Sequence, residues 1–221
     1  MNKPKLKLVS FNLCPYVQRA RITLQEKKLE HELEFIDLDM PPDWFFDVSP
    51  MEKVPVLLVD GESLFESMVI CDYIDNISGD ELYLKDPFKR AKQRAWIALG
   101  DAILGTVYDL MHADNEPDFK RAKATIIDRL DLLEEEMSDG PFFVGEKFGM
   151  VDVAYAPLFR YLTGIAGYAG VEFYEDVPGV KAWSERLLAY PAVMESVPED
   201  FETALKDYLK RPDTILGSLV K

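Results

Sequence analysis

The 221-residue sequence predicts an α/β domain followed by an all-α domain. Strand-like and helix-like segments alternate up to residue 80, whereas every regular segment after residue 87 has apolar positions at helical spacing. The expected domains are residues 1–80 and 88–221, joined by a polar linker at 81–87. With 48% apolar residues, the chain has enough material to pack both cores.

The first domain has the expected element order β-α-β, a short helical turn, then β-β-α. An apolar run that ends at Asn12 predicts the first strand, and Pro15 opens a helix that extends to Lys28. Asp60–Gly61 is a two-residue turn typical of a β-hairpin. The other expected elements are a strand at 32–36, a helical turn at 43–48, hairpin strands at 54–59 and 62–65, and a helix at 67–77. This is the order of a thioredoxin-like domain, with one parallel βαβ half and one hairpin half.

The second domain shows no convincing strand. Ile126, Leu130, Leu133 and Met137 form the apolar face of an amphipathic helix, and similar spacing recurs along the domain. The expected helices are 88–111, 116–137, 151–166, 180–188 and 199–210.

Composition excludes several classes of function. A net charge of −15 opposes binding to nucleic acids and to anionic membranes, and no apolar stretch is long enough to span a bilayer. The N-terminus lacks a secretory signal pattern, and two cysteines form no disulfide framework, which favours a cytoplasmic protein with reduced thiols. His31 and His112 are isolated, so no metal site is expected.

Cys14 is the candidate reactive residue, because it lies between the first strand and the first helix, with Pro15 at the first helical position. A thiol at this N-cap faces free amides and the positive end of the helix dipole, so a lowered pKa is expected. Arg19 and Arg21 lie on this helix, where they could add positive potential at Cys14, but both are expected to be ordinary solvated residues. No second cysteine follows three residues on, so an oxidised Cys14 requires an external thiol for its resolution. Cys71, inside an apolar helix segment, is expected to be a core residue.

Two further segments suit a peptide thiol. In thioredoxin-like folds the X-Pro bond at the position of Val54–Pro55 is cis and leaves the preceding backbone free to pair with an extended ligand. Glu66–Ser67 lies where a strand passes into a helix. If Ser67 has only a structural role, that role is to cap the N-terminus of the helix, for which serine is well suited. A helix N-terminus with a hydroxyl binds a carboxylate and an adjacent glutamate binds an amino group, which together suit the α-amino-acid end of a γ-glutamyl group.

These residues carry a family resemblance that covers nearly the whole chain. Segments 11–19, 42–46, 54–57 and 66–67 resemble the omega class of the cytosolic glutathione transferases, and the similar dehydroascorbate reductases share the Cys-Pro-aromatic-x-Gln-Arg pattern. Gly145–Asp152 resembles the capping segment that begins the buried central helix of the family.

The resemblance implies a catalytic Cys14 that forms a mixed disulfide with the co-substrate glutathione. It implies that the Val54 backbone, beside Pro55, holds the cysteinyl part of glutathione, and that Glu66 and Ser67 hold its γ-glutamyl end. Omega-like enzymes favour thiol transfer, dehydroascorbate reduction and deglutathionylation of small electrophilic, disulfide or oxidised substrates over simple conjugation. The resemblance also implies a homodimer.

Two positions depart from the omega pattern. Where a lysine commonly holds the glycine carboxylate, this chain has Asp39-Met40-Pro41, and Lys53 is the candidate replacement. Gly149 stands where the capping segment usually has Ser or Thr, and glycine is a tolerable N-cap.

Two alternatives share the fold. Stringent starvation regulators of bacteria are non-catalytic binding proteins that resemble the chain in the Val-Pro and Glu-Ser segments, but they generally lack a cysteine at the helix start. Chloride intracellular channel proteins share the Cys-Pro motif, but no apolar span here supports membrane insertion. The Cys14–Pro15 motif favours the enzyme.

Overall fold

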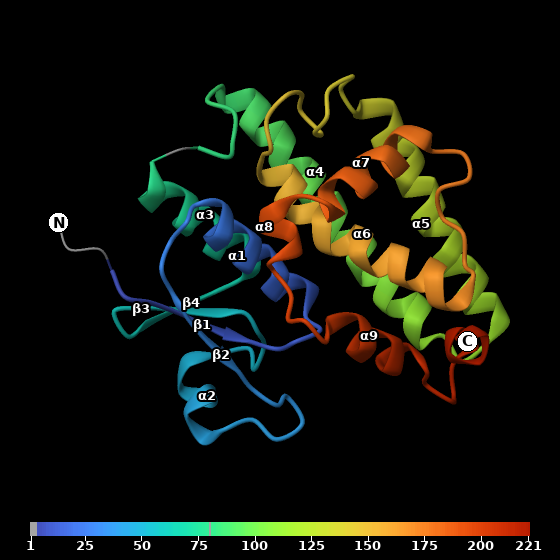
Figure 1. Cartoon of the computed structure of the whole chain (residues 1–221), viewed down its shortest axis with the longest axis horizontal. Helices are drawn as coiled ribbons and strands as arrows, with labels where there is room; N and C mark the ends of the chain where they lie inside the picture. Colours follow the sequence, from blue (N-terminus) through green and yellow to red (C-terminus); the bar gives the residue numbers. More distant parts are fainter. Residues whose placement is uncertain (1–3, 80) are drawn as a thin grey trace. The chain divides into compact units, whose positions relative to one another are not determined.

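The structure, a computed structural model, describes residues 4–79 and 81–221 and divides into two compact units (Figure 1). The first comprises Met1–Leu82 with Pro191–Pro198, and the second comprises Tyr83–Tyr190 with Glu199–Lys221. The first unit therefore includes a segment that the sequence analysis placed in the helical domain. Residue 80, the predicted end of the first domain, lies outside the described residues.

A four-stranded sheet of order β2-β1-β3-β4 organises the first unit. Strand β1 (Leu6–Ser10) pairs in parallel with β2 (Glu32–Phe35) and antiparallel with β3 (Val56–Val59), which pairs antiparallel with β4 (Glu62–Phe65). Strand β3 begins two residues later than the predicted start at Val54. Proline has no backbone N–H to donate to a sheet ladder, so the residues up to Pro55 stay outside the strand.

The hairpin between β3 and β4 forms at the predicted turn. Asp60 and Gly61 both have positive φ, of 50° and 94°, as a two-residue turn between strongly twisted strands requires. Glycine adopts this conformation without a steric cost.

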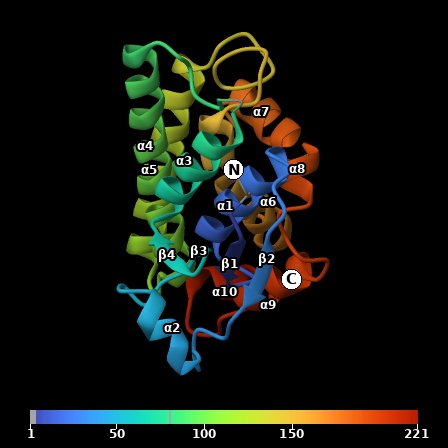
Figure 2. The same ribbon diagram turned by 90° about the vertical axis from the view of Figure 1, so that its left-hand side faces the viewer.

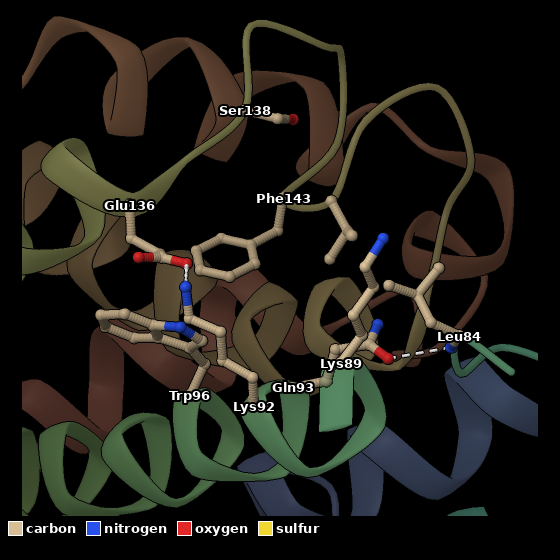
Figure 3. Close-up of a pocket in the computed structure, with 9 residues that line it drawn as sticks. Leu84, Lys89, Lys92, Gln93, Trp96, Glu136, Ser138 and Phe143 are labelled. Carbon is tan, nitrogen blue, oxygen red and sulfur yellow. Dashed lines mark hydrogen bonds and ion pairs between the residues drawn. The ribbon is translucent and has the colours of Figure 1, made fainter. Parts of the chain in front are cut away.

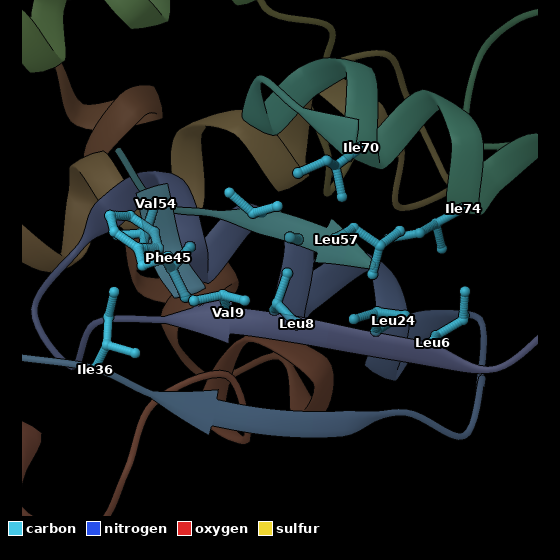
Figure 4. Close-up of a cluster of buried hydrophobic side chains, with 13 residues drawn as sticks. Leu6, Leu8, Val9, Leu24, Ile36, Phe45, Val54, Leu57, Ile70 and Ile74 are labelled. Carbon is cyan, nitrogen blue, oxygen red and sulfur yellow. The ribbon is translucent and has the colours of Figure 1, made fainter. Parts of the chain in front are cut away.

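Helices α1 (Pro15–Glu26) and α3 (Ser67–Ser78) pack against each other, and α8 (Pro191–Met194) packs on α1. The single turn α2 (Asp43–Val48) precedes the loop to β3. Apolar side chains from β1, α1, β3 and α3 form one buried cluster, completed by Phe45 of α2 (Figure 4). The predicted α/β thioredoxin-like arrangement is confirmed.

The second unit contains six helices in the described residues: α4 (Pro87–His112), α5 (Glu116–Glu136), α6 (Met150–Ala169), α7 (Pro178–Leu188), α9 (Phe201–Leu209) and α10 (Ile215–Leu219). Helices α4 and α5 run side by side (Figure 2). The sequence analysis missed the short helices α8 and α10, because four or five residues cannot show a helical period. The all-α prediction for this domain is confirmed.

Helix α6 is buried on nearly all sides, as expected of a helix without a polar face. Asp152 in its first turn accepts hydrogen bonds from the backbone N–H of Gly149 (2.8 Å), the backbone N–H of Phe143 (3.1 Å) and Nε1 of Trp183 (2.7 Å). Gly149 is the N-cap, so this helix begins with a capping carboxylate and no capping hydroxyl.

Candidate functional site

Cys14 lies at the junction between β1 and α1. Its backbone N–H donates to the carbonyl of Phe11 at 3.1 Å, which closes the turn after the strand. Cys14 is the N-cap of α1 with extended dihedrals (φ −74°, ψ 116°), and Pro15 occupies the first helical position. The structure thus places the half-buried thiol where the Cys-Pro spacing predicts it.

The protonation of Cys14 differs from the prediction. Burial raises the pKa of the Cys14 thiol above its ordinary value, and this exceeds the opposing effects of the Val17 and Tyr16 amides and of the Arg19 charge. The thiol also donates a hydrogen bond to the carbonyl oxygen of Val54, with Sγ and O 3.6 Å apart, which stabilises the protonated form. The expected lowering was wrong for the unliganded protein, because it considered the helix N-terminus without the cost of desolvation.

The two arginines of α1 also differ from the prediction of solvated side chains. Arg19 is fully buried, and its guanidinium carbon lies 5.3 Å from the centroid of the Tyr16 ring. Arg21 is half-buried, and its Nη2 donates to the carbonyl oxygen of Glu195 at 3.3 Å. Arg19 shares a helix face with the buried Ile22 and Thr23, and this spacing was the sequence signal that could have indicated its burial.

The Val54–Pro55 peptide bond is cis, and both residues are buried. The preceding Lys53 has an exposed side chain, but its backbone is fixed by Ser49. The Ser49 hydroxyl accepts from the Lys53 N–H (2.9 Å) and donates to the Lys53 carbonyl (2.8 Å). Ser49, which the sequence analysis did not single out, therefore positions the segment that carries Lys53 and Val54.

Glu66 has a left-handed backbone, with φ 71° and ψ 114°, which is unusual for a residue with a side chain and costs on the order of 1–3 kcal/mol. Its side chain is exposed, whereas Ser67 is buried. Glu66 is the N-cap of α3 and Ser67 is the first helical residue, so the prediction that Ser67 caps the helix was wrong. Strained backbones of this kind concentrate at ligand-binding sites.

The register of the sheet brings these segments to one end. Val56 pairs with Val9 on one side and with Phe65 on the other. Because both pairings are antiparallel, the chain before Val56 lies at the same end as the chain that follows Val9 and Phe65. Cys14, Val54 and Glu66 belong to these three segments.

Cys71 is fully buried in α3, and burial raises the pKa of its thiol to about 12. This agrees with its interpretation as a core residue. Of the aromatic residues on α4 and α6, Tyr155 and Phe159 are buried in the core, and Tyr108 is exposed and stacked on His112.

No group of three or more His, Cys, Asp or Glu side chains in the described part of the chain could hold a metal ion. None of the described helices is long and apolar enough to cross a membrane.

The protein combines a thioredoxin-like unit, which has a cysteine at the N-terminus of its first helix, with an all-helical unit. Comparisons with known proteins identify the family that has this combination. The glutathione S-transferase N-terminal domain matches residues 13–77, and the glutathione S-transferase C-terminal domain matches residues 116–186. The chain is 30% identical to glutathione S-transferase U22 of Arabidopsis thaliana over 86% of this chain and 88% of the relative.

Solved structures show the same similarity. A Tau class glutathione S-transferase from mango superposes with a TM-score of 0.83 at 30% identity, over 93% of this chain and 97% of that one. A rice glutathione S-transferase in complex with glutathione gives 0.84 at 28% identity, over 95% and 98%. The omega 3C enzyme of Trametes versicolor gives 0.81 at 26% identity, over 88% and 90%. The chain belongs to the glutathione S-transferase family, and its function is that of a glutathione S-transferase.

Proposed function

We propose that the protein is an omega-like transferase that carries out glutathione-dependent thiol transfer through Cys14. The observation that carries this proposal is the contact between the Cys14 thiol and the Val54 carbonyl, next to the cis Val54–Pro55 bond. A nucleophilic sulfur therefore lies beside a backbone segment outside the sheet ladder, where an extended thiol peptide can pair.

Glutathione is held at three points in this proposal. Its cysteinyl backbone pairs with Val54, whose N–H donates to no described residue. The γ-glutamyl amino group pairs with the exposed Glu66 carboxylate, and the γ-glutamyl carboxylate takes the Ser67 hydroxyl and the free amides at the start of α3. The glycine carboxylate pairs with the ammonium of Lys53.

The chemistry is two thiol–disulfide exchanges. The Cys14 thiolate attacks the glutathionyl sulfur of a mixed disulfide, forms Cys14–S–S–glutathione, and releases the substrate thiol, which takes up the proton that Cys14 lost. A second glutathione, as thiolate, attacks the glutathionyl sulfur of that intermediate. Cys14 leaves as a thiolate and oxidised glutathione is released, so each step breaks one S–S bond and forms another.

Ligand pairing with Val54 would remove one group that stabilises the protonated thiol, whereas burial, the main cause of the raised pKa of Cys14, persists. When the cysteinyl N–H of glutathione donates to the Val54 carbonyl, it competes with the Cys14 thiol for this acceptor. The sulfur then keeps the amides of Tyr16 and Val17 and the charge of Arg19, all of which favour the thiolate. We infer that loss of the Val54 acceptor on glutathione binding shifts Cys14 toward the thiolate, against the effect of burial.

Three properties complete the proposal. The substrates are small disulfides, glutathionylated compounds and oxidised compounds of the dehydroascorbate type. The enzyme is cytoplasmic, where reduced glutathione is available. It forms a homodimer, and sedimentation at micromolar concentration should give about twice the chain mass of 25.3 kDa; a monomer would contradict this part.

Incubation of the protein with oxidised glutathione tests the mechanism directly. Intact-mass measurement should show one added glutathionyl group, and peptide mapping should place it on Cys14. An adduct that forms equally in Cys14→Ala would place the reaction on Cys71 and overturn the role of Cys14. No adduct and no turnover of hydroxyethyl disulfide by the wild type would favour a non-catalytic binding protein of the same fold.

A further inference from the structure

Helix α2 and its two flanking loops present large apolar side chains to the solvent. The exposed fraction is 78% for Met40, 48% for Phe46 and 57% for Met51. Within the first unit, α2 lies on the side of the sheet away from α3 (Figures 1 and 2). Single exposed apolar residues are ordinary on protein surfaces, but several on one short segment favour a docking surface.

One face of α2 combines an apolar side chain with two carboxylates. Asp43, Phe46 and Asp47 are exposed, and residues three and four positions apart share a helix face. Met40 precedes this face along the chain and Met51 follows it. These five side chains are called the α2 surface below.

The charge of the segment that carries the α2 surface is entirely negative. Residues 37–52 contain five acidic residues and no Lys, Arg or His. In the described part of the chain none of these five carboxylates forms an ion pair. By contrast, Glu34 is paired with Lys7, and Glu136 of the second unit is paired with Lys92 (Figure 3). A partner that complements the α2 surface therefore has both apolar and basic side chains.

This segment begins at the end of the sheet that holds Cys14. Strand β2 runs parallel to β1, so the chain leaves both strands at the same end. Ile36, which follows β2, donates its N–H to the carbonyl of Ser10 at 2.9 Å. Ser10 is the last residue of β1, and the next residues along the chain lead to Cys14.

The rest of the segment is fixed next to Val54. Phe45 is only 1% exposed and belongs to the buried cluster that also contains Val9 and Val54 (Figure 4). The Ser49 hydroxyl holds the backbone of Lys53, which directly precedes Val54. Because the Val54 carbonyl accepts from the candidate nucleophile, the α2 surface is anchored to the same part of the fold as the reactive thiol.

We propose that the α2 surface binds polypeptide substrates, and that it selects glutathionylated cysteines flanked by basic and apolar residues. This inference rests on the proposed thiol transfer and names its macromolecular substrate. Basic side chains of the substrate pair with Asp43 and Asp47, and its apolar side chains contact Phe46. The Cys14 sulfur attacks the glutathionyl sulfur, and the bond to the substrate cysteine breaks. The substrate sulfur leaves with the electron pair of that bond and takes up the proton that Cys14 lost.

The test compares short glutathionylated peptides that have leucine with lysine, or leucine with glutamate, on both sides of the cysteine. Their turnover with glutathione is corrected for the uncatalysed rate. Wild type should show a kcat/KM about tenfold higher for the lysine peptide, because exposed charge pairs each contribute modestly. The preference should disappear at about 1 M salt, where the screening length is about 3 Å.

Reversal of the surface charge tests the contacts themselves. Asp43→Lys/Asp47→Lys should invert the preference, so that the glutamate peptide becomes the better substrate. Glu30→Lys/Glu62→Lys is the matched control, with the same change in net charge on exposed residues at the opposite end of the sheet. The control should keep the wild-type preference. An equal inversion in the control would overturn the proposal, because net charge alone would then explain the effect.

Phe46→Ala tests the apolar contact. It should lower kcat/KM for the lysine peptide about fivefold and leave the turnover of hydroxyethyl disulfide unchanged. Melting temperatures confirm that each variant is folded, and if Phe46→Ala does not fold, the charge variants still decide the outcome.

Three results would overturn the proposal. The first is equal kcat/KM for both peptides in the wild type, and turnover of hydroxyethyl disulfide would then show that thiol transfer itself stands. The second is no turnover of either peptide or of hydroxyethyl disulfide, which would also overturn the proposed function. The third is a changed sedimentation mass of Asp43→Lys/Asp47→Lys together with loss of both peptide activities, which would assign the α2 surface to a contact between copies of the chain.

Discussion

The sulfur of Cys14 lies 3.6 Å from the carbonyl oxygen of Val54, and the thiol donates a hydrogen bond to it. A single backbone acceptor thereby contacts the candidate nucleophile and belongs to the segment proposed to bind glutathione. Since the acceptor stabilises the protonated thiol, its engagement by a ligand connects glutathione binding to the reactivity of Cys14.

The first prediction concerns the unliganded thiol. Because burial raises the pKa of Cys14, alkylation by iodoacetamide should be slow at pH 7 and should increase with pH beyond the midpoint of a free thiol, near pH 8.5. A Cys71→Ala background makes the signal specific, and an unstructured cysteine peptide blocked at both ends is the reference thiol. A midpoint below that of the reference would show that the helix N-terminus outweighs burial.

The second prediction separates the two cysteines. Cys14→Ala should reduce hydroxyethyl disulfide reduction to the uncatalysed rate, because no other thiol of the described residues lies at the candidate site. Cys71→Ala should retain this activity and lose about 1 kcal/mol of stability, since it removes one fully buried sulfur. The measurements are the turnover rate and the urea midpoint. Comparable losses of activity in both variants would place Cys71 in the chemistry.

The third prediction concerns Glu66. Glu66→Gln should weaken glutathione binding roughly tenfold to hundredfold by removing a charge-assisted contact, about 1.5–3 kcal/mol. Calorimetry and the glutathione-dependent rise in melting temperature measure the loss. Glu62→Gln, an exposed residue of the same hairpin, is the control and should leave the affinity unchanged.

The strained backbone at Glu66 gives this position a second test. Glu66→Gly relieves the positive φ of 71° and should stabilise the unliganded fold by about 1 kcal/mol while it weakens glutathione binding. A variant that loses both stability and affinity would show that Glu66 has a structural role in the fold.

The sequence predicted those features that depend on local chemistry. The single turn Asp43–Val48 and the strand Glu62–Phe65 have the predicted bounds, because turn-forming residues delimit both. The cis state of Val54–Pro55 was expected only from the thioredoxin-like fold. An X-Pro bond alone does not predict it.

Other features depended on contacts distant in sequence and could not be predicted. The burial of Arg19 and the raised pKa of Cys14 result from how α1 packs in the folded unit. The same is true of segment 191–198, which joins the first unit although it follows more than a hundred residues of the second. Local composition does not contain this information.

The last prediction concerns the pH dependence of folding. Burial raises the pKa of Asp152 to about 6, against an ordinary value near 3.9, although its three hydrogen-bond donors oppose this shift. Between about pH 4 and pH 6 the folded state therefore binds more protons at this residue than the unfolded state. The contribution of Asp152 to the free energy of unfolding must then decrease as the pH rises through this window.

Asp152→Asn removes this titration. The difference in unfolding free energy, wild type minus variant, should decrease by on the order of 2–3 kcal/mol from pH 4 to pH 7, as measured by urea titration at each pH. The variant should also be less stable at pH 7 by about 1–3 kcal/mol. Its Oδ1 can still accept from Phe143 and Trp183, but its amide nitrogen meets the N–H donor of Gly149. A difference that stays constant across the pH range would show that the three donors outweigh burial and keep this carboxylate ionised throughout.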